Sequence, residues 1–198
     1  MSELKTYQPV YERIQLVEKL PPCKRILDVG CGDGIYFPYL SQKTGEVVGI
    51  DFSPDRLIRS KKLGALLVRG DAGVLPFRDE SFETVWASEV IEHTPSLDVF
   101  GELERVAKDC IIATMPNPDG PYYGRDSNHI LKFEIDSLKQ FLGKRRWSYA
   151  IRGLGMCLPY SFIPRIIRVI FLKLTWNHPK LAWNFSVIGF RNPEKANA

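Results

Sequence analysis

The sequence predicts an α/β fold, a single domain on a doubly wound sheet, and three observations support this prediction. An apolar run at residues 25–29 ends in a glycine-rich turn at 30–34. A second apolar run at 47–51 ends in a carboxylate, Asp51. Segments with strand and helix character then alternate along most of the chain, as in sheets covered by helices on both faces. The 198 residues are enough for one domain with a substantial core, not two.

The first half of the chain shows clear helix boundaries. Apolar residues at helical spacing lie between 10 and 20, and Pro21 and Pro22 end that segment. Ser53, followed by Pro54, has the residue types of a helix N-cap and first turn. We therefore expect helices over 10–20, from the glycine turn to about 42, and over 53–63, with strands at 25–29, 47–51 and 66–71.

The second half continues the alternation and then changes character. Strands are predicted at 82–87, 110–114, 147–151 and 185–190, and helices at 97–108 and 134–141. The connection between the last two strands is far longer than a hairpin loop. We expect one domain over 1–198 with a helical insertion at about 156–183.

The glycine turn indicates which kind of nucleoside ligand fits. A dinucleotide fold needs the pattern G-x-G-x-x-G, whose third glycine brings a helix N-terminus close to a pyrophosphate. In this chain Ile35 takes the place of that third glycine, and Asp33 adds negative charge where phosphates would lie. A ligand with ribose and adenine but no phosphate fits better, and S-adenosylmethionine is such a ligand.

Polar residues and glycines follow the predicted strands at the edge where such a sheet binds ligands. Buried acids without partners are costly, so acids at successive strand ends suggest a binding site. The residues at these ends are Asp28 and Gly30, Asp51, Asp71, Ser88 and Glu89, and Pro116 and Asn117.

Four sequence landmarks in order resemble the class I S-adenosylmethionine-dependent methyltransferases, in particular the small ubiquinone- and menaquinone-pathway-like subgroup. The resemblance runs from about residue 10 to 118. The landmarks are residues 27–34, 49–53, 70–77 and 81–93. It implies a Rossmann-like sheet of seven strands, mostly parallel, with an antiparallel last strand. It also implies an enzyme that transfers a methyl group from S-adenosylmethionine.

The resemblance and the strand ends together give a set of candidate cofactor-binding residues. Asp51 is expected to accept hydrogen bonds from ribose hydroxyls, and Asp71 with the Ala72 amide to contact the adenine edge. Asp28 has a second interpretation, because it can also hydrogen-bond the glycine loop. The full set is Asp28, Gly30, Cys31, Gly32, Asp51, Phe52, Asp71, Ala72 and Ser88.

The segment 88–93 contains the candidate catalytic residues, which are Glu89, Glu92 and His93. On a helical turn these three would share one face. Three interpretations stay open: the face lines the pocket, a Glu or His is a general base, or the three side chains bind a divalent cation such as Mg²⁺. The E-x-x-E-H pattern resembles a metal-binding motif of ubiquinone-pathway O-methyltransferases. His129 is a further pocket residue or ligand under the same interpretations, or a structural histidine.

Composition excludes several other functions. A net charge of +4 is too mild to indicate nucleic acid, and the four cysteines lack the spacing of a zinc site or a disulfide framework. The turn at 116–118 superficially resembles the Asn-Pro-Pro motif of DNA methyltransferases but follows the fifth strand, so no DNA substrate is expected. The polar start of the chain shows no signal peptide, which makes the cytoplasm the expected location.

The segment 158–183 raises the question of partners. Residues 163–176 within it are strongly apolar but include Arg165, Arg168 and Lys173, so this stretch is too charged and too short to span a bilayer. We expect a helical lid or a dimer contact, with a peripheral membrane contact as the alternative. Together with Tyr122 and Tyr123, it suggests an aromatic or lipid-like small-molecule acceptor. The atom methylated is left open.

Two other functions remain compatible with parts of this pattern. A protein could keep the S-adenosylmethionine pocket for binding without catalysis, since the glycine loop and the acids indicate binding and not turnover. An NAD(P)-dependent oxidoreductase is the second alternative, and residues 33 and 35 argue against it.

Overall fold

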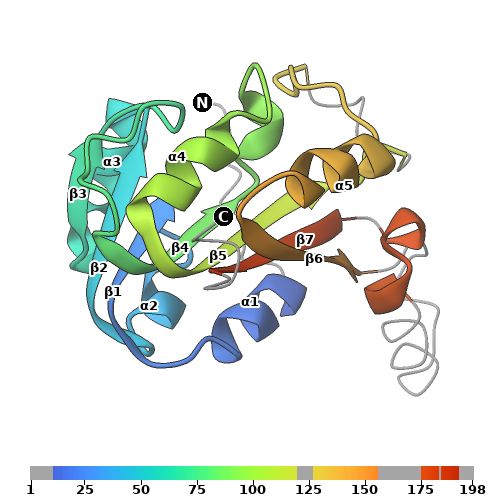
Figure 1. The fold of residues 1–198 in the computed structure, drawn as a ribbon. Helices are drawn as coiled ribbons and strands as arrows, with labels where there is room; N and C mark the ends of the chain where they lie inside the picture. Colours follow the sequence, from blue (N-terminus) through green and yellow to red (C-terminus); the bar gives the residue numbers. More distant parts are fainter. Residues whose placement is uncertain (1–10, 120–126, 156–174, 183, 192–198) are drawn as a thin grey trace, which may run out of the picture.

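The computed structural model describes residues 11–119, 127–155, 175–182 and 184–191. Its strands form one seven-stranded sheet in the order β3-β2-β1-β4-β5-β7-β6 (Figure 1). The first five strands in this order are parallel, and β7 runs antiparallel to both neighbours. The strands are β1 (Cys23–Val29), β2 (Thr44–Asp51), β3 (Leu66–Arg69), β4 (Phe82–Ser88), β5 (Ala107–Pro116), β6 (Trp147–Leu154) and β7 (Asn184–Arg191). This arrangement confirms the predicted fold class.

Helices cover both faces of the sheet, and each face has its own apolar cluster. Neighbouring β1 residues alternate between them: Ile26 packs with the buried residues of α1, α2 and α3, and Leu27 with those of α4 and α5. Figure 1 shows α4 and α5 on one side of the sheet and α1 and α2 on the other. The helices are α1 (Tyr11–Glu18), α2 (Phe37–Leu40), α3 (Pro54–Ser60), α4 (Val99–Val106) and α5 (Ile135–Gly143). Short 3-10 turns are η1 (Lys61–Leu63), η2 (Ile91–His93) and η5 (Pro179–Leu181).

The long helix expected after the glycine turn is wrong. Only the single turn α2 forms, because Gly30, Gly32 and Gly34 have φ angles of 65°, 53° and 75°. These left-handed conformations cannot belong to an α-helix, so the chain reaches Phe37 through a series of turns. The glycine loop at the end of β1 is therefore irregular and not helical.

The helix after β2 begins and ends as expected, although its last turn is a 3-10 helix. The Ser53 hydroxyl accepts a hydrogen bond from the Arg56 backbone N–H at 3.5 Å, which confirms the N-cap. The helix then tightens into η1, and Gly64 terminates it with a φ of 80°. At the far end of β3 the strand stops at Arg69, so Asp71 lies in the following loop and not in the strand.

The boundary between α4 and β5 also differs from the expectation. Ala107 takes an extended conformation, with φ −82° and ψ 139°, and pairs with Phe82 of β4. The pairing with β4 therefore converts residues 107–109, of which the first two were expected to be helical, into the start of β5. The strand ends at Pro116, where the turn was expected.

The predicted insertion falls largely on residues 156–174 and 183, which lie outside the described residues, as do Tyr122 and Tyr123. Of its described part, Pro179–Leu181 form the turn η5, which Asn117 holds against the end of β5. The Asn117 side-chain amide donates to the carbonyl oxygens of Lys180 at 3.1 Å and Ala182 at 2.7 Å. Within the described parts of the chain, no helix has the length and apolar character needed to cross a membrane.

Candidate functional site

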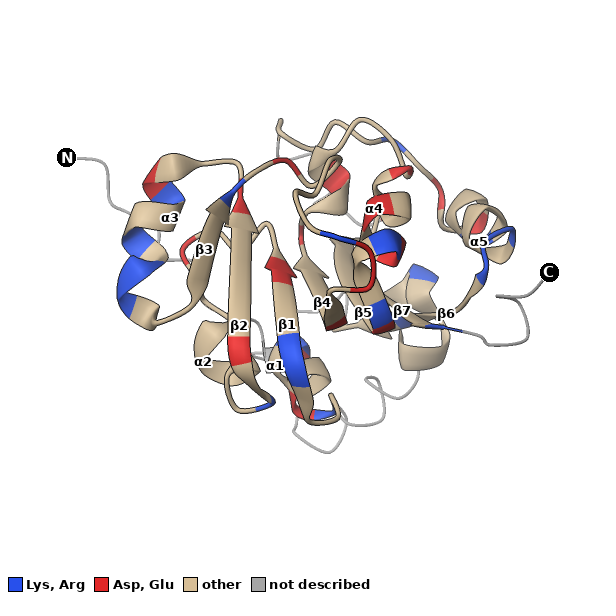
Figure 2. Ribbon diagram, turned by 60° about the vertical axis from the view of Figure 1, so that its left-hand side comes forward, with Lys and Arg blue, Asp and Glu red and all other residues tan. Residues whose placement is uncertain are grey.

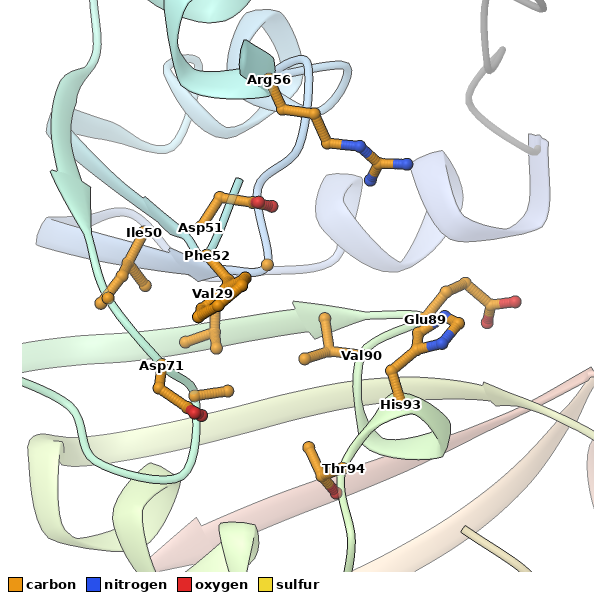
Figure 3. Close-up of a pocket in the computed structure, with 13 residues that line it drawn as sticks. Val29, Ile50, Asp51, Phe52, Arg56, Asp71, Glu89, Val90, His93 and Thr94 are labelled. Carbon is orange, nitrogen blue, oxygen red and sulfur yellow. The ribbon is translucent and has the colours of Figure 1, made fainter. Parts of the chain in front are cut away.

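A cavity of about 400 Å³ opens at the carboxyl ends of the parallel strands, where the sequence places its polar residues (Figure 3). Loops that follow β1, β2, β3 and β4 form its walls. The lining residues are Val29, Gly30, Ile50, Asp51, Phe52, Arg56, Gly70, Asp71, Ala72, Glu89, Val90, His93 and Thr94. Five predicted cofactor residues (Gly30, Asp51, Phe52, Asp71 and Ala72) are among them.

The glycine loop packs closely against two neighbouring side chains, Val90 and Arg56. A Cβ atom added to Gly30 would overlap the Val90 side chain, and one added to Gly32 would lie 3.2 Å from Arg56 Nη1. Glycine at these positions therefore allows the loop to approach both neighbours closely. The loop is fixed by Asp51, because the Gly32 backbone N–H donates to Asp51 Oδ2 at 2.7 Å.

Asp51 is 8% exposed, and its carboxylate is oriented from two sides. Oδ2 accepts the Gly32 N–H, and Oδ1 accepts the Ser53 N–H at 2.8 Å. A carboxylate has about four lone-pair positions, so two remain for hydroxyl donors of a ligand. Its position at the end of β2 and on the cavity wall suits a pair of ribose hydroxyls.

Asp71 lies on the exposed side of the same cavity. Its Oδ1 accepts the Gly73 N–H at 2.8 Å, and its carbonyl oxygen accepts the Val74 N–H at 3.2 Å. These bonds form a tight turn that presents Asp71 and Ala72 to the cavity. Phe52, with 72% of its surface exposed, lies on the wall between Asp51 and this turn (Figure 3).

Four other predicted cofactor residues do not line the cavity: Asp28, Cys31, Gly32 and Ser88. Asp28 is 2% exposed, and burial, followed by the negative charge of Asp51, raises its pKa well above the usual range. Ser88 shares a 2.9 Å hydrogen bond with the Thr114 hydroxyl. These residues support the walls in this structure, and their cofactor contacts stay predictions.

Glu89, Glu92 and His93 do not share one helical face, so that expectation is wrong. The only helical turn here is η2, which begins after Glu89. Glu89 has a φ of 55°, the left-handed conformation that is rare for residues other than glycine, so it cannot belong to the same helical turn as the other two. Its Oε1 instead forms an ion pair with Arg13 Nη2 of α1 at 2.8 Å.

His93 and Glu92 have different environments. Glu92 is fully buried, and its carbonyl oxygen accepts the backbone N–H groups of Ile130 and Leu131. The His93 side chain is 39% exposed and lines the cavity. Its Nδ1 lies 2.9 Å from the Asn128 carbonyl oxygen, which can only accept, so this contact places the proton on Nδ1. The neutral ring then has its lone pair on Nε2.

His129 joins this pair in place of Glu89. Ligand atoms of Glu92, His93 and His129 all lie within 4.8 Å of one another, and the two imidazole rings are 5.1 Å apart. The structure thus groups two imidazoles with one carboxylate, whereas the sequence suggested two carboxylates with one imidazole. Glu89 is separated from the group by its pairing with Arg13.

Six lining residues were not predicted from the sequence: Val29, Ile50, Arg56, Gly70, Val90 and Thr94. Val29, Ile50 and Gly70 directly precede predicted site residues at strand ends, so extending each strand-end motif by one position would have found them. Arg56 could have been found only from its position in the first turn of the helix that follows Asp51, which is a weaker signal. The inward position of Val90 and Thr94 depends on the left-handed Glu89, which no sequence pattern indicated.

Comparisons with known proteins point to a methyltransferase domain. Residues 27–110 match the family described as "Methyltransferase domain". The malonyl-[acyl-carrier protein] O-methyltransferase of Legionella pneumophila is 34% identical over 120 residues, which cover 56% of this chain and 42% of that protein. The 2-methyl-6-phytyl-1,4-hydroquinone methyltransferase of Synechocystis is 39% identical over 99 residues, covering 46% and 31%. The matched region thus spans less than half the length of these relatives.

Solved structures extend the likeness to nearly the whole chain at the level of the fold. A SAM-dependent methyltransferase from Thermotoga maritima aligns with a TM-score of 0.68 at 16% identity, covering 91% of this chain and 88% of that one. One from Archaeoglobus fulgidus aligns with a TM-score of 0.63 at 19% identity, covering 89% and 90%. At these identities the likeness concerns the fold alone.

Proposed function

We propose that this chain, which carries a class I S-adenosylmethionine-dependent methyltransferase domain, binds S-adenosylmethionine in the cavity and methylates a small-molecule acceptor. The observation that carries the proposal is the convergence of three strand ends on one cavity. There the glycine loop, the Asp51 carboxylate and the Asp71–Ala72 turn lie on adjoining walls. Their chemistry matches the parts of a nucleoside with an amino-acid tail.

The cavity walls suggest how the cofactor lies. Asp51 accepts the ribose hydroxyls, the Asp71–Ala72 turn contacts the adenine edge, and the exposed Phe52 ring offers a flat surface to the base. The methionine end then extends toward Gly30 and Glu89. Arg56 lines this cavity, and in Figure 3 its guanidinium lies on the side of Asp51 away from Asp71. That position suits the cofactor's carboxylate.

The chemistry needs alignment more than a protein nucleophile. S-adenosylmethionine supplies a methyl group on a sulfonium; the acceptor lone pair bonds to this carbon as the C–S bond breaks, leaving a neutral thioether. The protein contributes positioning and exclusion of water, which can supply roughly 7–11 kcal/mol. We assign His93 as the proton acceptor, because it lines the cavity and its Nε2 carries the lone pair when Nδ1 donates to Asn128. The buried Glu92 carboxylate, 4.0 Å from Nε2, would stabilise the imidazolium that forms. Glu89 is already paired with Arg13.

A divalent cation held by Glu92, His93 and His129 is the alternative to this proton transfer, because the metal would take the same Nε2 of His93. Two imidazole nitrogens and one carboxylate oxygen suit Zn²⁺ or Fe²⁺ better than Mg²⁺, which prefers oxygen ligands. The Asn128 carbonyl would fix the His93 tautomer that leaves Nε2 for the metal. Stoichiometric Zn²⁺ binding that is lost in His129→Ala would support it. Without Zn²⁺ binding, the metal proposal fails and the methyltransferase proposal stands.

The glycine loop argues against the oxidoreductase alternative. Asp33 is paired with Arg59 at 2.9 Å, so its charge is a weaker argument against a pyrophosphate than the sequence suggested. The stronger one is the short α2, which begins only at Phe37 and offers no helix N-terminus at the glycine loop. A protein that binds the cofactor without turnover remains distinguishable by experiment.

The methyl acceptor, the partners of this chain and its cell compartment are also part of the proposal. The named relatives act, by their names, on malonyl-[acyl-carrier protein] and on 2-methyl-6-phytyl-1,4-hydroquinone. An apolar or aromatic small molecule is therefore the first class of acceptor to screen, with DNA as a negative control. A cytoplasmic location, and a dimer or membrane contact through 158–183, are proposals that rest on sequence alone.

The test is calorimetric titration with S-adenosylmethionine, S-adenosylhomocysteine and NAD⁺. We expect micromolar affinity for the first two, no binding of NAD⁺, and an affinity at least about tenfold lower in Asp51→Asn, which loses charge-assisted bonds. Asp33→Asn, which breaks the nearby exposed pair with Arg59, serves as the matched control. Binding of NAD⁺ alone, or equal losses in both variants, would contradict the proposal.

Turnover requires its own measurement. With an acceptor identified, His93→Gln is expected to lower kcat by about 10²-fold or more while cofactor affinity stays within a few-fold. An unchanged kcat would remove His93 from the proposed proton transfer. Tight cofactor binding with no methylation of any acceptor in a broad panel would favour the non-catalytic binding protein.

A further inference from the structure

The turn that presents Asp71 and Ala72 is held from outside the cavity. Hydrogen bonds within residues 71–74 shape the turn itself but do not fix where it lies. The chain beyond it crosses to α4, where Glu102 Oε2 accepts the Leu75 backbone N–H at 2.7 Å. Leu75 is 3% exposed and the Glu102 side chain 22%, so the donor end of this bond is buried and the acceptor end is partly exposed.

Arg105, one turn after Glu102, completes the attachment. Its Nη2 donates to the Leu75 carbonyl oxygen at 2.9 Å, and its Nη1 donates to the Phe77 carbonyl oxygen at 2.7 Å. Arg105 also pairs with Glu102 itself at 2.8 Å. One guanidinium therefore bridges two carbonyls of the loop and the carboxylate that accepts the Leu75 N–H. Lysine cannot reproduce this use of the planar fork.

Charge strengthens this arrangement. Nη1 of Arg105 lies 2.9 Å from Asp79 Oδ1, further along the same loop. The hydrogen bond from Arg105 is the main reason why the pKa of Glu102 lies below its usual value. Hydrogen bonds between ionised groups are stronger than neutral ones. Figure 2 shows basic and acidic segments side by side where α4 meets the loop that leads into β4.

The helix that carries the pair is itself fixed in the core. Phe100 and Leu103 of α4 are fully buried. At its N-terminal end, α4 follows the segment that contains Val90 and Thr94, which line the opposite side of the cavity. One rigid helix thus connects the two walls between which the cofactor would lie.

We infer that Arg105 and Glu102 are positioning residues: they hold the 71–77 loop on α4 so that Asp71 and Ala72 meet the adenine half of the cofactor. This inference rests on the proposed function. Neither residue lines the cavity, so their effect on binding acts through the loop. Loss of the pair is expected to lower the affinity for every ligand that contains adenosine, whatever group is attached to it.

The chain offers a closely matched control, an ion pair between α4 and the segment that follows α5. Arg145 forms a two-pronged ion pair with Glu104, at 2.6 and 2.7 Å, and both partners are at least as buried as Arg105 and Glu102. Glu104 also accepts the Tyr149 hydroxyl, so this pair ties α4 to β6 and not to the cofactor loop. Breaking it costs α4 an ion pair without touching residues 71–77.

The experiment compares R105Q with R145Q by titration with S-adenosylhomocysteine and 5′-methylthioadenosine, which lacks the amino-acid tail. In R105Q we expect the affinity for both ligands to fall by about tenfold, and in R145Q by less than about twofold. Hydrogen exchange is expected to accelerate at residues 71–77 in R105Q alone. Should R105Q fail to fold, R105K, which keeps the charge but not the fork, carries the same expectation with a smaller loss.

Other outcomes would overturn the inference. Equal losses in R105Q and R145Q would show general destabilisation, and a loss for S-adenosylhomocysteine alone would place the effect at the methionine end. Unchanged affinity in R105Q would show that the loop holds its position without the pair. A wild-type protein that binds neither ligand would instead contradict the proposed function, so the two failures are distinguishable.

Discussion

Arg56 contributes a positive charge to a cavity wall that otherwise contains the acids Asp51, Asp71 and Glu89. Glu89 has a protein partner in Arg13. Within the described part of the chain, the Arg56 guanidinium forms no ion pair, and its backbone N–H bonds to Ser53. A cation in this position is suited to the carboxylate of an amino-acid tail.

Replacing this cation gives a prediction that separates two halves of the cofactor. Arg56→Met is expected to lower the affinity for S-adenosylhomocysteine by about tenfold, because one charge-assisted hydrogen bond is lost. Affinity for 5′-methylthioadenosine, which has no carboxylate, is expected to stay the same. Calorimetry with both ligands checks this, with Arg59→Met as the control on the same helix. A parallel loss for both ligands would instead assign Arg56 to the adenosine half.

Asp28 gives a prediction about pH. Burial raises its pKa in the folded protein well above the unfolded value, so folding favours the protonated carboxyl. Its contribution to stability is fully present below the unfolded pKa and is lost as the pH rises through the folded pKa. Asp28→Asn keeps the shape without the charge, and is therefore expected to raise Tm by a few degrees at pH 7 and by less near pH 4. Thermal melts across this range test it; an equal shift at both pH values would show that the charge is not the cause.

At the scale of single elements, α1 is attached to the end of β4 by the ion pair between Arg13 and Glu89. The two side chains are 4% and 19% exposed, which places the pair in the interior rather than at the surface. Glu89 takes its left-handed conformation at this point, so the helix and the strained residue are stabilised together. The same residue begins the wall formed by Val90 and Thr94.

Removing one partner of this pair is expected to cost more than removing both. Arg13→Met leaves the Glu89 carboxylate with a partly buried charge, at a cost of roughly 3 kcal/mol. Adding Glu89→Gln is expected to recover part of this loss, because the neutral amide needs no cation. Denaturant melts of the two single variants and the double variant measure the coupling. Additive losses would mean that the ion pair does not contribute to docking of α1.

For the whole molecule, the cavity joins strand ends that are distant from one another in the sequence, from Val29 to Thr94. Its walls come from loops after β1, β2, β3 and β4, so ligand binding is expected to stabilise the complete fold and not one loop. At a hundred times its Kd, S-adenosylhomocysteine is expected to add about 2.7 kcal/mol of stability, which is several degrees in Tm for a chain of this size. Thermal melts at rising ligand concentration check the shift in Tm. Because Asp51→Asn raises the Kd, this variant is expected to need more ligand, in proportion to its Kd, for the same shift. A concentration-independent Tm would contradict binding at this cavity.

The sequence by itself determined the fold class, the order of the elements and one edge of the site. Apolar runs that end in glycine or a carboxylate have a direct physical meaning, since parallel strands bring their carboxyl ends to one edge of a sheet. Gly30, Asp51 and Asp71 could therefore be assigned to one cavity before any coordinates were known. The N-cap at Ser53 was equally readable, because its cause is local.

Only the tertiary structure decided which contact partners Glu89, Glu92 and His93 have. Their spacing suggested one face, but that holds only on a helix, and pairing of β4 with β5 and the left-handed Glu89 prevent one here. Arg13 and His129, distant in sequence, then become the partners of Glu89 and His93. The attachment of the 71–77 loop by Arg105 was hidden for the same reason. Local patterns encode local conformation, whereas these contacts exist only once the strands have brought distant segments together.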